Sequence, residues 1–151
     1  MTTIHLITKV NSPVQIVFDL NRNIDIHKLS TAKSNESAID GVTSGLINLN
    51  ETVTWYGKHF GIYQIHKSKI TAMEFPNYFV DEMVKGRFKS FKHEHTFVEQ
   101  NGKTIMTDTV EYQTPFGIFG RLFDQFILKN YLTTFITERN TFIKNLAENN
   151  D

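Results

Sequence analysis

The hydrophobic pattern of this chain changes its period once, near Thr114 and Pro115. From about residue 48 to residue 114, apolar and polar residues alternate with a period of two, which is typical of strands buried on one face. Beyond residue 115 the apolar residues recur about every 3.6 positions, and the stripe from Leu122 to Leu146 predicts a helix of roughly 25 residues. A helix with so many phenylalanines must pack against a large apolar partner, and the preceding sheet is the only candidate.

Turn residues divide the alternating region into five expected strands, at residues 51–60, 62–74, 78–85, 91–100 and 103–114. The first ten residues also alternate, which predicts a further strand at the N-terminus. Ser12 is expected to cap a short helix that begins at Pro13, and a second short helix is expected at residues 25–29. The sequence therefore predicts an α+β protein with an antiparallel sheet of six to seven strands.

Composition excludes several classes of protein. Sixteen basic and sixteen acidic residues give no net charge, so no overall positive field favours nucleic acid as a partner. The absence of cysteine excludes disulfides, thiolate zinc sites and a cysteine nucleophile. Neither a leader nor an apolar window of about 18 residues is found, so we expect a cytoplasmic protein without integral membrane association. We expect one domain at residues 1–148 and a polar tail at residues 149–151.

The last hairpin has the clearest register, because Asn101-Gly102 is a strong signal for a two-residue turn. Pairing Gln100 with Lys103 sorts the side chains of both strands into an inner and an outer face. On the inner face it places Phe97 opposite Met106, His95 opposite Asp108, His93 opposite Val110 and Phe91 opposite Tyr112.

A turn near Gly86 extends this register to the preceding strand. It would place Met83 near Phe91, Asp81 near His93 and Phe79 near His95. Asp81 and Asp108 would then flank the two histidines on an otherwise apolar surface. Because buried ionisable groups need partners, this cluster predicts mutual pairing, bound water or a polar ligand group.

Several segments resemble a bacterial ligand-binding branch of the SRPBCC superfamily, which includes START domains, polyketide cyclases and birch-pollen-allergen-like proteins. The resemblance extends over nearly the whole chain and rests on Ser12-Pro13, Trp55, Lys58–Ile62, Lys69-Ile70-Thr71, Phe79-Val80-Asp81, Gly86-Arg87-Phe88, Phe91–Phe97, Thr107-Asp108, Tyr112 and Pro115–Arg121. It implies a helix-grip fold: a curved antiparallel sheet wrapped around a long C-terminal helix, with two short helices after strand one and a cavity between sheet and helix. Arg87 departs from the small residue or proline that is common there, which bears on the shape of that turn.

The first functional hypothesis is a carrier, sensor or sequestering module that encloses a small hydrophobic or amphipathic molecule. Phe, Met, Val and Tyr side chains, with an inward Trp55, would form an apolar wall, and the His and Asp side chains would meet the polar end of the ligand. The expected ligand-binding residues are Trp55, Phe79, Asp81, Met83, Phe91, His93, His95, Phe97, Met106, Asp108, Val110 and Tyr112.

Two alternatives stay open. In the first, the protein is a cyclase, dehydratase or hydrolase in which His95, assisted by Asp108, moves a proton on the substrate. In the second, phenylalanines fill the cavity and the protein docks on another macromolecule. The His93-Glu94-His95 spacing also suits a metal, but alone it is a weak signal, so no metal or other cofactor is expected. We expect His27, His59 and His66 to be exposed or satisfied within the structure.

Overall fold

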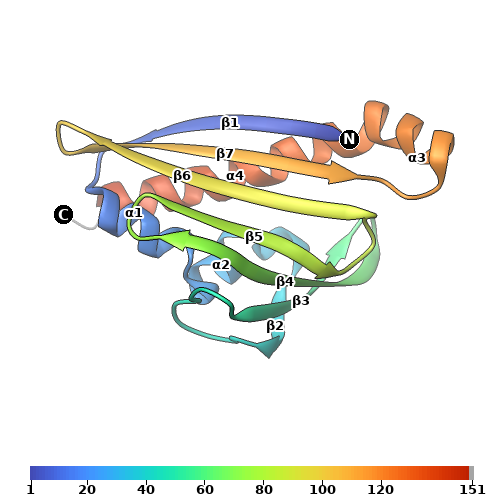
Figure 1. Ribbon diagram of the computed structural model, residues 1–151, viewed down its shortest axis with the longest axis horizontal. Helices are drawn as coiled ribbons and strands as arrows, with labels where there is room; N and C mark the ends of the chain where they lie inside the picture. Colours follow the sequence, from blue (N-terminus) through green and yellow to red (C-terminus); the bar gives the residue numbers. More distant parts are fainter. Residues whose placement is uncertain (150–151) are drawn as a thin grey trace.

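A computed structural model describes residues 1–149 as one seven-stranded antiparallel sheet with helices packed on one face (Figure 1). The strands lie in the order β1-β7-β6-β5-β4-β3-β2. Their bounds are β1 Thr2–Val10, β2 Ser37–Gly41, β3 Thr52–His59, β4 Ile62–Glu74, β5 Tyr78–Lys85, β6 Ser90–Gln100 and β7 Lys103–Gln113. The α+β class and the antiparallel sheet of six to seven strands are thus confirmed, and β2 lies in a segment for which the sequence pattern predicted no element.

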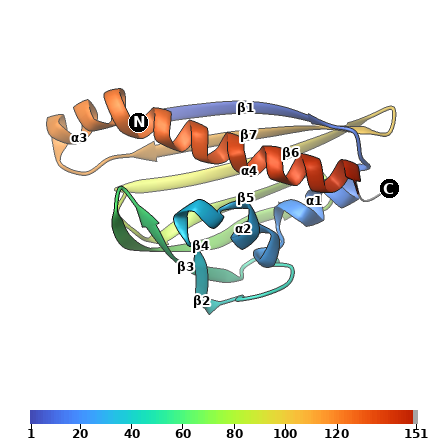
Figure 2. The same cartoon turned by 180° about the vertical axis from the view of Figure 1, so that it is seen from behind.

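The helices include the two short ones predicted after the first strand and a long one at the C-terminus. Their bounds are α1 Val14–Asn21, α2 Ile24–Ser30, a 3₁₀ turn at Ala32–Ser34, α3 Gly117–Phe123, a π-helical turn at Asp124–Leu128 and α4 Lys129–Asn149. Figure 2 shows α4 lying across the sheet with α1 and α2 beside it. This arrangement is the expected grip of a curved sheet on a long helix.

The starts of two helices differ from the expectation. Pro13 occupies the N-cap position of α1, one residue later than expected. The side chain of Ser12 makes no capping hydrogen bond, so the prediction that it caps this helix is wrong. The C-terminal helix begins at Gly117, several residues before the expected stripe. Gly120 makes this entry possible, since a Cβ there would lie 1.8 Å from the Pro115 carbonyl oxygen.

The domain boundary expected at residue 148 falls within the last turn of α4. α4 runs to Asn149, one residue beyond the boundary expected at residue 148. The other two residues of the predicted polar tail, 150 and 151, lie outside the described residues.

The predicted register of the last hairpin is confirmed at every pair. Asn101 and Gly102 both have positive φ angles, as the two-residue turn requires. The inner-face pairs are Phe97 with Met106, His95 with Asp108, His93 with Val110 and Phe91 with Tyr112.

The second predicted register is confirmed for two of its three pairs. Asp81 pairs with His93 and Phe79 with His95, but pairing of β5 with β6 ends at Glu82. Met83 therefore does not pair with Phe91, and this part of the prediction is wrong. The chain leaves β6 here for a wide turn through residues 86–89, and Met83 pairs with Ser68 of β4 instead.

The inner face of the sheet packs in two apolar groups. One lies under α1 and includes Phe18, whose ring makes edge contacts with Phe79 and Phe97. The other lies under the first half of α4 and includes Val110 and Tyr112. The polar side chains of the candidate site lie between these two groups.

Candidate functional site

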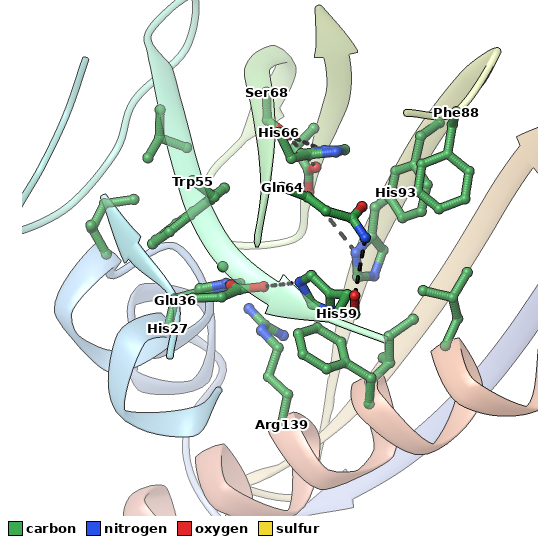
Figure 3. Close-up of a pocket in the computed structure, with 18 of the residues that line it drawn as sticks. His27, Glu36, Trp55, His59, Gln64, His66, Ser68, Phe88, His93 and Arg139 are labelled. Atoms are coloured by element: carbon green, nitrogen blue, oxygen red, sulfur yellow. Dashed lines mark hydrogen bonds and ion pairs between the residues drawn. The ribbon is translucent and has the colours of Figure 1, made fainter. Parts of the chain in front are cut away.

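A cavity of about 220 Å³ lies between strands β3–β6 on one side and α2 and α4 on the other (Figure 3). Its apolar lining includes Trp55, Phe79, Phe91, Leu132, Phe135 and Ile136. The strands and the helix each contribute to this wall, because both turn an apolar face inward. Polar side chains interrupt the lining in two clusters and at one arginine.

The first cluster, here the His–Asp cluster, consists of Asp81, His93, His95 and Asp108 from three neighbouring strands. His93 Nε2 donates to Asp108 Oδ1 at 2.7 Å, and His95 Nε2 lies 3.3 Å from Asp81 Oδ2. His95 Nδ1 is 3.0 Å from Asp108 Oδ1, although its alignment is too poor for a hydrogen bond. The two rings therefore lie side by side between two carboxylates, with their centroids 3.8 Å apart.

Asp108 lies on the side of this cluster away from the cavity and accepts hydrogen bonds there. It is 1% exposed, and its second oxygen accepts a hydrogen bond of 2.7 Å from Asn140 Nδ2 on α4. On the cavity side, Ser68 Oγ lies 3.4 Å from Asp81 Oδ1 and 3.1 Å from His66 Nε2. The polar network thus runs from β4 across the sheet to the C-terminal helix.

Burial and pairing shift the pKa values of these four groups in opposite directions. Burial alone would raise the carboxyl pKa values, but hydrogen bonds from the histidines outweigh it, so the pKa of Asp81 falls to about 2 and that of Asp108 falls well below its ordinary value. Burial and the neighbouring His95 lower the pKa of His93. For His95, burial is outweighed by the two flanking carboxylates, so its pKa is raised. Two adjacent imidazoles that line the cavity beside carboxylates are the kind of groups that serve as general acids or bases.

The second cluster, here the Glu36 cluster, consists of His27, Glu36, His59 and Tyr131. Glu36 Oε2 accepts a hydrogen bond of 2.7 Å from His27 Nε2, and Glu36 Oε1 accepts one of 3.0 Å from His59 Nε2. The other ring nitrogen of His59 lies 2.6 Å from the Tyr131 hydroxyl. His27 also stacks on Trp55, with the ring centroids 4.1 Å apart. Because an ionised carboxylate only accepts, both histidines must carry a proton on Nε2.

Replacing Glu36 with glutamine is expected to lower the free energy of unfolding at neutral pH by about 1–3 kcal/mol. The amide can accept from one histidine but turns an N–H toward the other. The difference in stability between wild type and variant should become smaller at acidic pH. Burial raises the pKa of the folded Glu36 carboxyl, but hydrogen bonds from both histidines outweigh burial and hold it far below its usual 4.5. The unfolded chain therefore takes up the proton first, and this contribution is full above pH 4.5 and lost as the pH falls below it.

Urea unfolding at several pH values between about 6 and 3 measures this difference. Glu138→Gln is the matched control, since Glu138 is half-exposed and pairs with Lys33 at the surface. A constant difference between wild type and Glu36→Gln over the whole range would contradict the expectation.

Arg139 projects from α4 toward the cavity and is 5% exposed (Figure 3). Nη1 donates to the side-chain oxygens of Asn21 at 3.1 Å and of Asn140 at 3.4 Å, and Nη2 donates to the Asn21 backbone oxygen at 2.9 Å. A guanidinium has five N–H groups, so two of them lack a partner within residues 1–149. Among those residues no carboxylate lies within 4.0 Å of it. Arg139 is thus a buried cation with unused donors.

Half of the twelve residues expected to bind ligand line the cavity: Trp55, Phe79, Asp81, Phe91, His93 and His95. Trp55 faces inward as expected. The other six do not reach the cavity surface. Phe97 and Met106 are packed beneath α1, Val110 and Tyr112 beneath α4, Asp108 lies behind the histidines, and Met83 lies beside Gly86.

Several polar residues of the cavity were not predicted as site residues. His27, His59 and His66 have partners, as expected, but all three also line the cavity. The sequence gives no indication that Glu36 belongs to a site, because Glu36 lies in a segment without a clear hydrophobic pattern. The sequence does single out Arg139, since a charged residue on the apolar stripe of a helix has to be buried together with that stripe.

The chain matches no protein-family model and no curated protein sequence, but solved structures share its fold. A START superfamily protein from Mycobacterium smegmatis has a TM-score of 0.73 at 7% identity, with 97% of each chain covered. Major latex-like protein 151 from Panax ginseng has a TM-score of 0.71 at 15% identity, again with 97% of each chain covered. A protein from Thermus thermophilus has a TM-score of 0.72 at 12% identity, covering 97% of this chain and 99% of the other.

The chain therefore has the helix-grip fold of START and other SRPBCC proteins. At these identities the likeness shows the fold alone. Within residues 1–149 no helix is both long and apolar enough to pass through a bilayer.

Proposed function

We propose that the protein binds a small hydrophobic or amphipathic molecule in the cavity between sheet and α4, as a carrier, sensor or sequestering module. The observation that carries this proposal is the cavity itself, whose aromatic and aliphatic walls enclose a few convergent polar groups. Such a combination is typical of sites for small organic ligands. The helix-grip fold of the START and major latex-like proteins supports it.

The polar groups suggest how such a ligand would be oriented. The two unused N–H donors of Arg139 would bind an acceptor oxygen of the ligand, such as a carbonyl, hydroxyl or carboxylate. His93 and His95 would meet a second polar group at the sheet wall. The apolar body of the ligand would lie against Trp55 and Phe135.

Filling the cavity should weaken binding without unfolding the protein. Leu132 lines the cavity and is partly buried, so Leu132→Trp is expected to weaken binding of the fluorescent probe 1-anilinonaphthalene-8-sulfonate by at least about tenfold, which is about 1.4 kcal/mol. Leu29→Trp is the matched control, because Leu29 is 60% exposed and does not line the cavity. Fluorescence titration measures the affinity, and thermal unfolding checks that both variants are folded.

Native mass spectrometry of the protein purified from cells adds a second measurement. A defined lipophilic adduct that is present on wild type and Leu29→Trp but absent from Leu132→Trp supports the proposal. A wild-type protein that carries no adduct and does not bind the probe contradicts it, as does equal binding by both variants.

A second candidate function is catalysis in the same cavity. It is favoured by the position of His95, which is 2% exposed, lines the cavity and lies between the carboxylates of Asp81 and Asp108. A histidine so placed can take a proton from a bound substrate and be stabilised in its charged form. Turnover of a bound molecule, rather than its binding, separates this candidate from the first.

A further inference from the structure

We propose that Asp81, His93 and His95 form a binding site for a divalent first-row transition metal ion such as Zn²⁺ in the wall of the cavity. This site would be a property of the protein itself and does not require the organic ligand. The H-x-H spacing on β6 is a weak signal by itself. What carries the proposal is the arrangement of the surrounding groups.

The three side chains turn metal-binding atoms toward one another. One such atom from each residue lies within 4.8 Å of the other two. Asp81 Oδ2 is 3.3 Å from His95 Nε2 and 4.0 Å from His93 Nδ1. Coordination at about 2.0–2.2 Å places ligand atoms roughly 3–3.5 Å apart, so a closure of about 1 Å would complete the site.

The other nitrogen of each ring lies close to one carboxylate, although that of His93 alone of the two is aligned for a hydrogen bond. His93 Nε2 is 2.7 Å and His95 Nδ1 is 3.0 Å from Asp108 Oδ1. Asn140 in turn holds the second oxygen of Asp108 at 2.7 Å. Metal-binding histidines nearly always direct their second nitrogen to such an acceptor, which orients the ring and strengthens it as a ligand. Here a single buried carboxylate would do this for both rings.

The local charge also favours a divalent cation. Asp81 and Asp108 place two carboxylates around two imidazoles, and no arginine or lysine lies within 4.0 Å of either carboxylate among residues 1–149. A divalent ion would balance both charges. Two imidazoles and one carboxylate suit zinc and its first-row neighbours, whereas magnesium and calcium prefer oxygen ligands alone.

The remaining coordination positions would face the cavity, because all three residues line it. Water or an oxygen atom of a cavity ligand could occupy them. Three protein ligands with an open position characterise metal sites that bind a further molecule. The metal would thus lie where the proposed polar end of a ligand is held.

Titration of the chelator-treated full chain with Zn²⁺ alone tests the site. Isothermal calorimetry is expected to show one ion per chain, Co²⁺ is expected to develop visible absorption bands, and Mg²⁺ is expected to show no binding. In nitrogen-detected NMR, one ring nitrogen of His93 and one of His95 should shift on addition of Zn²⁺. These measurements use the wild-type protein, so they do not depend on the folding of a variant.

Variants then locate the ion. Asp81→Asn and His93→Ala are each expected to lower the affinity for Zn²⁺ by at least about 10–100-fold, the loss typical even of the outer acceptors of metal-binding histidines. His5→Ala is the control, since His5 is exposed on β1, where its ring lies 3.2 Å from the Thr109 hydroxyl. No binding at one ion per chain, or binding that Asp81→Asn leaves unchanged, would overturn the proposal and leave the cluster as a structural His–Asp pair. Because no organic molecule is present, such a failure would leave the ligand-binding proposal standing.

Discussion

Replacing Asp108 with alanine is expected to lower the free energy of unfolding by about 3–5 kcal/mol, the range for breaking a buried ion pair by removing one partner. Asp108 is 1% exposed and is the acceptor for His93 and Asn140. Without it, His93 Nε2 would be buried with no partner, and Asn140 Nδ2 would keep the longer hydrogen bond of 3.4 Å to Thr8 Oγ1. Urea unfolding followed by circular dichroism measures the loss.

Asp40→Ala is the matched control for this change. The side chain of Asp40 is 67% exposed and lies 3.6 Å from Lys67, so its removal should alter the free energy of unfolding by less than about 0.5 kcal/mol. If Asp108→Ala behaved like Asp40→Ala, the proposed role of Asp108 as the anchor of the His–Asp cluster would be wrong.

Truncating Phe97 to alanine is expected to lower the free energy of unfolding by a similar 3–5 kcal/mol or so, as is usual for a buried phenylalanine. Phe97 is 1% exposed, and its ring contacts those of Phe18 and Phe79. Its neighbour Val98 is 52% exposed on the other face of β6, so Val98→Ala should have a small effect. Thermal and urea unfolding of the two variants compare the faces directly, and equal losses would contradict the register of the hairpin.

That register shows which part of the site can be predicted from the sequence. Asn101-Gly102 fixes a turn of two residues, and strand alternation then places every side chain of β6 and β7 on one face or the other. The meeting of His95 with Asp108 follows from these two local rules. The same rules do not show which inward residues reach a cavity, because that depends on where α1 and α4 cover the sheet.

The Glu36 cluster shows what local patterns leave out. Its four members come from α2, the segment before β2, the end of β3 and α4, and they meet only after the whole chain has folded. No periodicity joins His27 to Tyr131, and Glu36 lies in a stretch whose hydrophobic pattern defines no element. The predicted pairing of Met83 with Phe91 was wrong for a related reason. The turn after β5 has no two-residue signature that fixes its width.

One helix supplies a contact to each polar part of the cavity. Tyr131 reaches His59, Arg139 reaches Asn21, and Asn140 reaches Asp108, all from α4. Any displacement of this helix away from the sheet would strain the three contacts at once. We therefore expect the three contacts to break and re-form together when the proposed ligand enters or leaves the cavity.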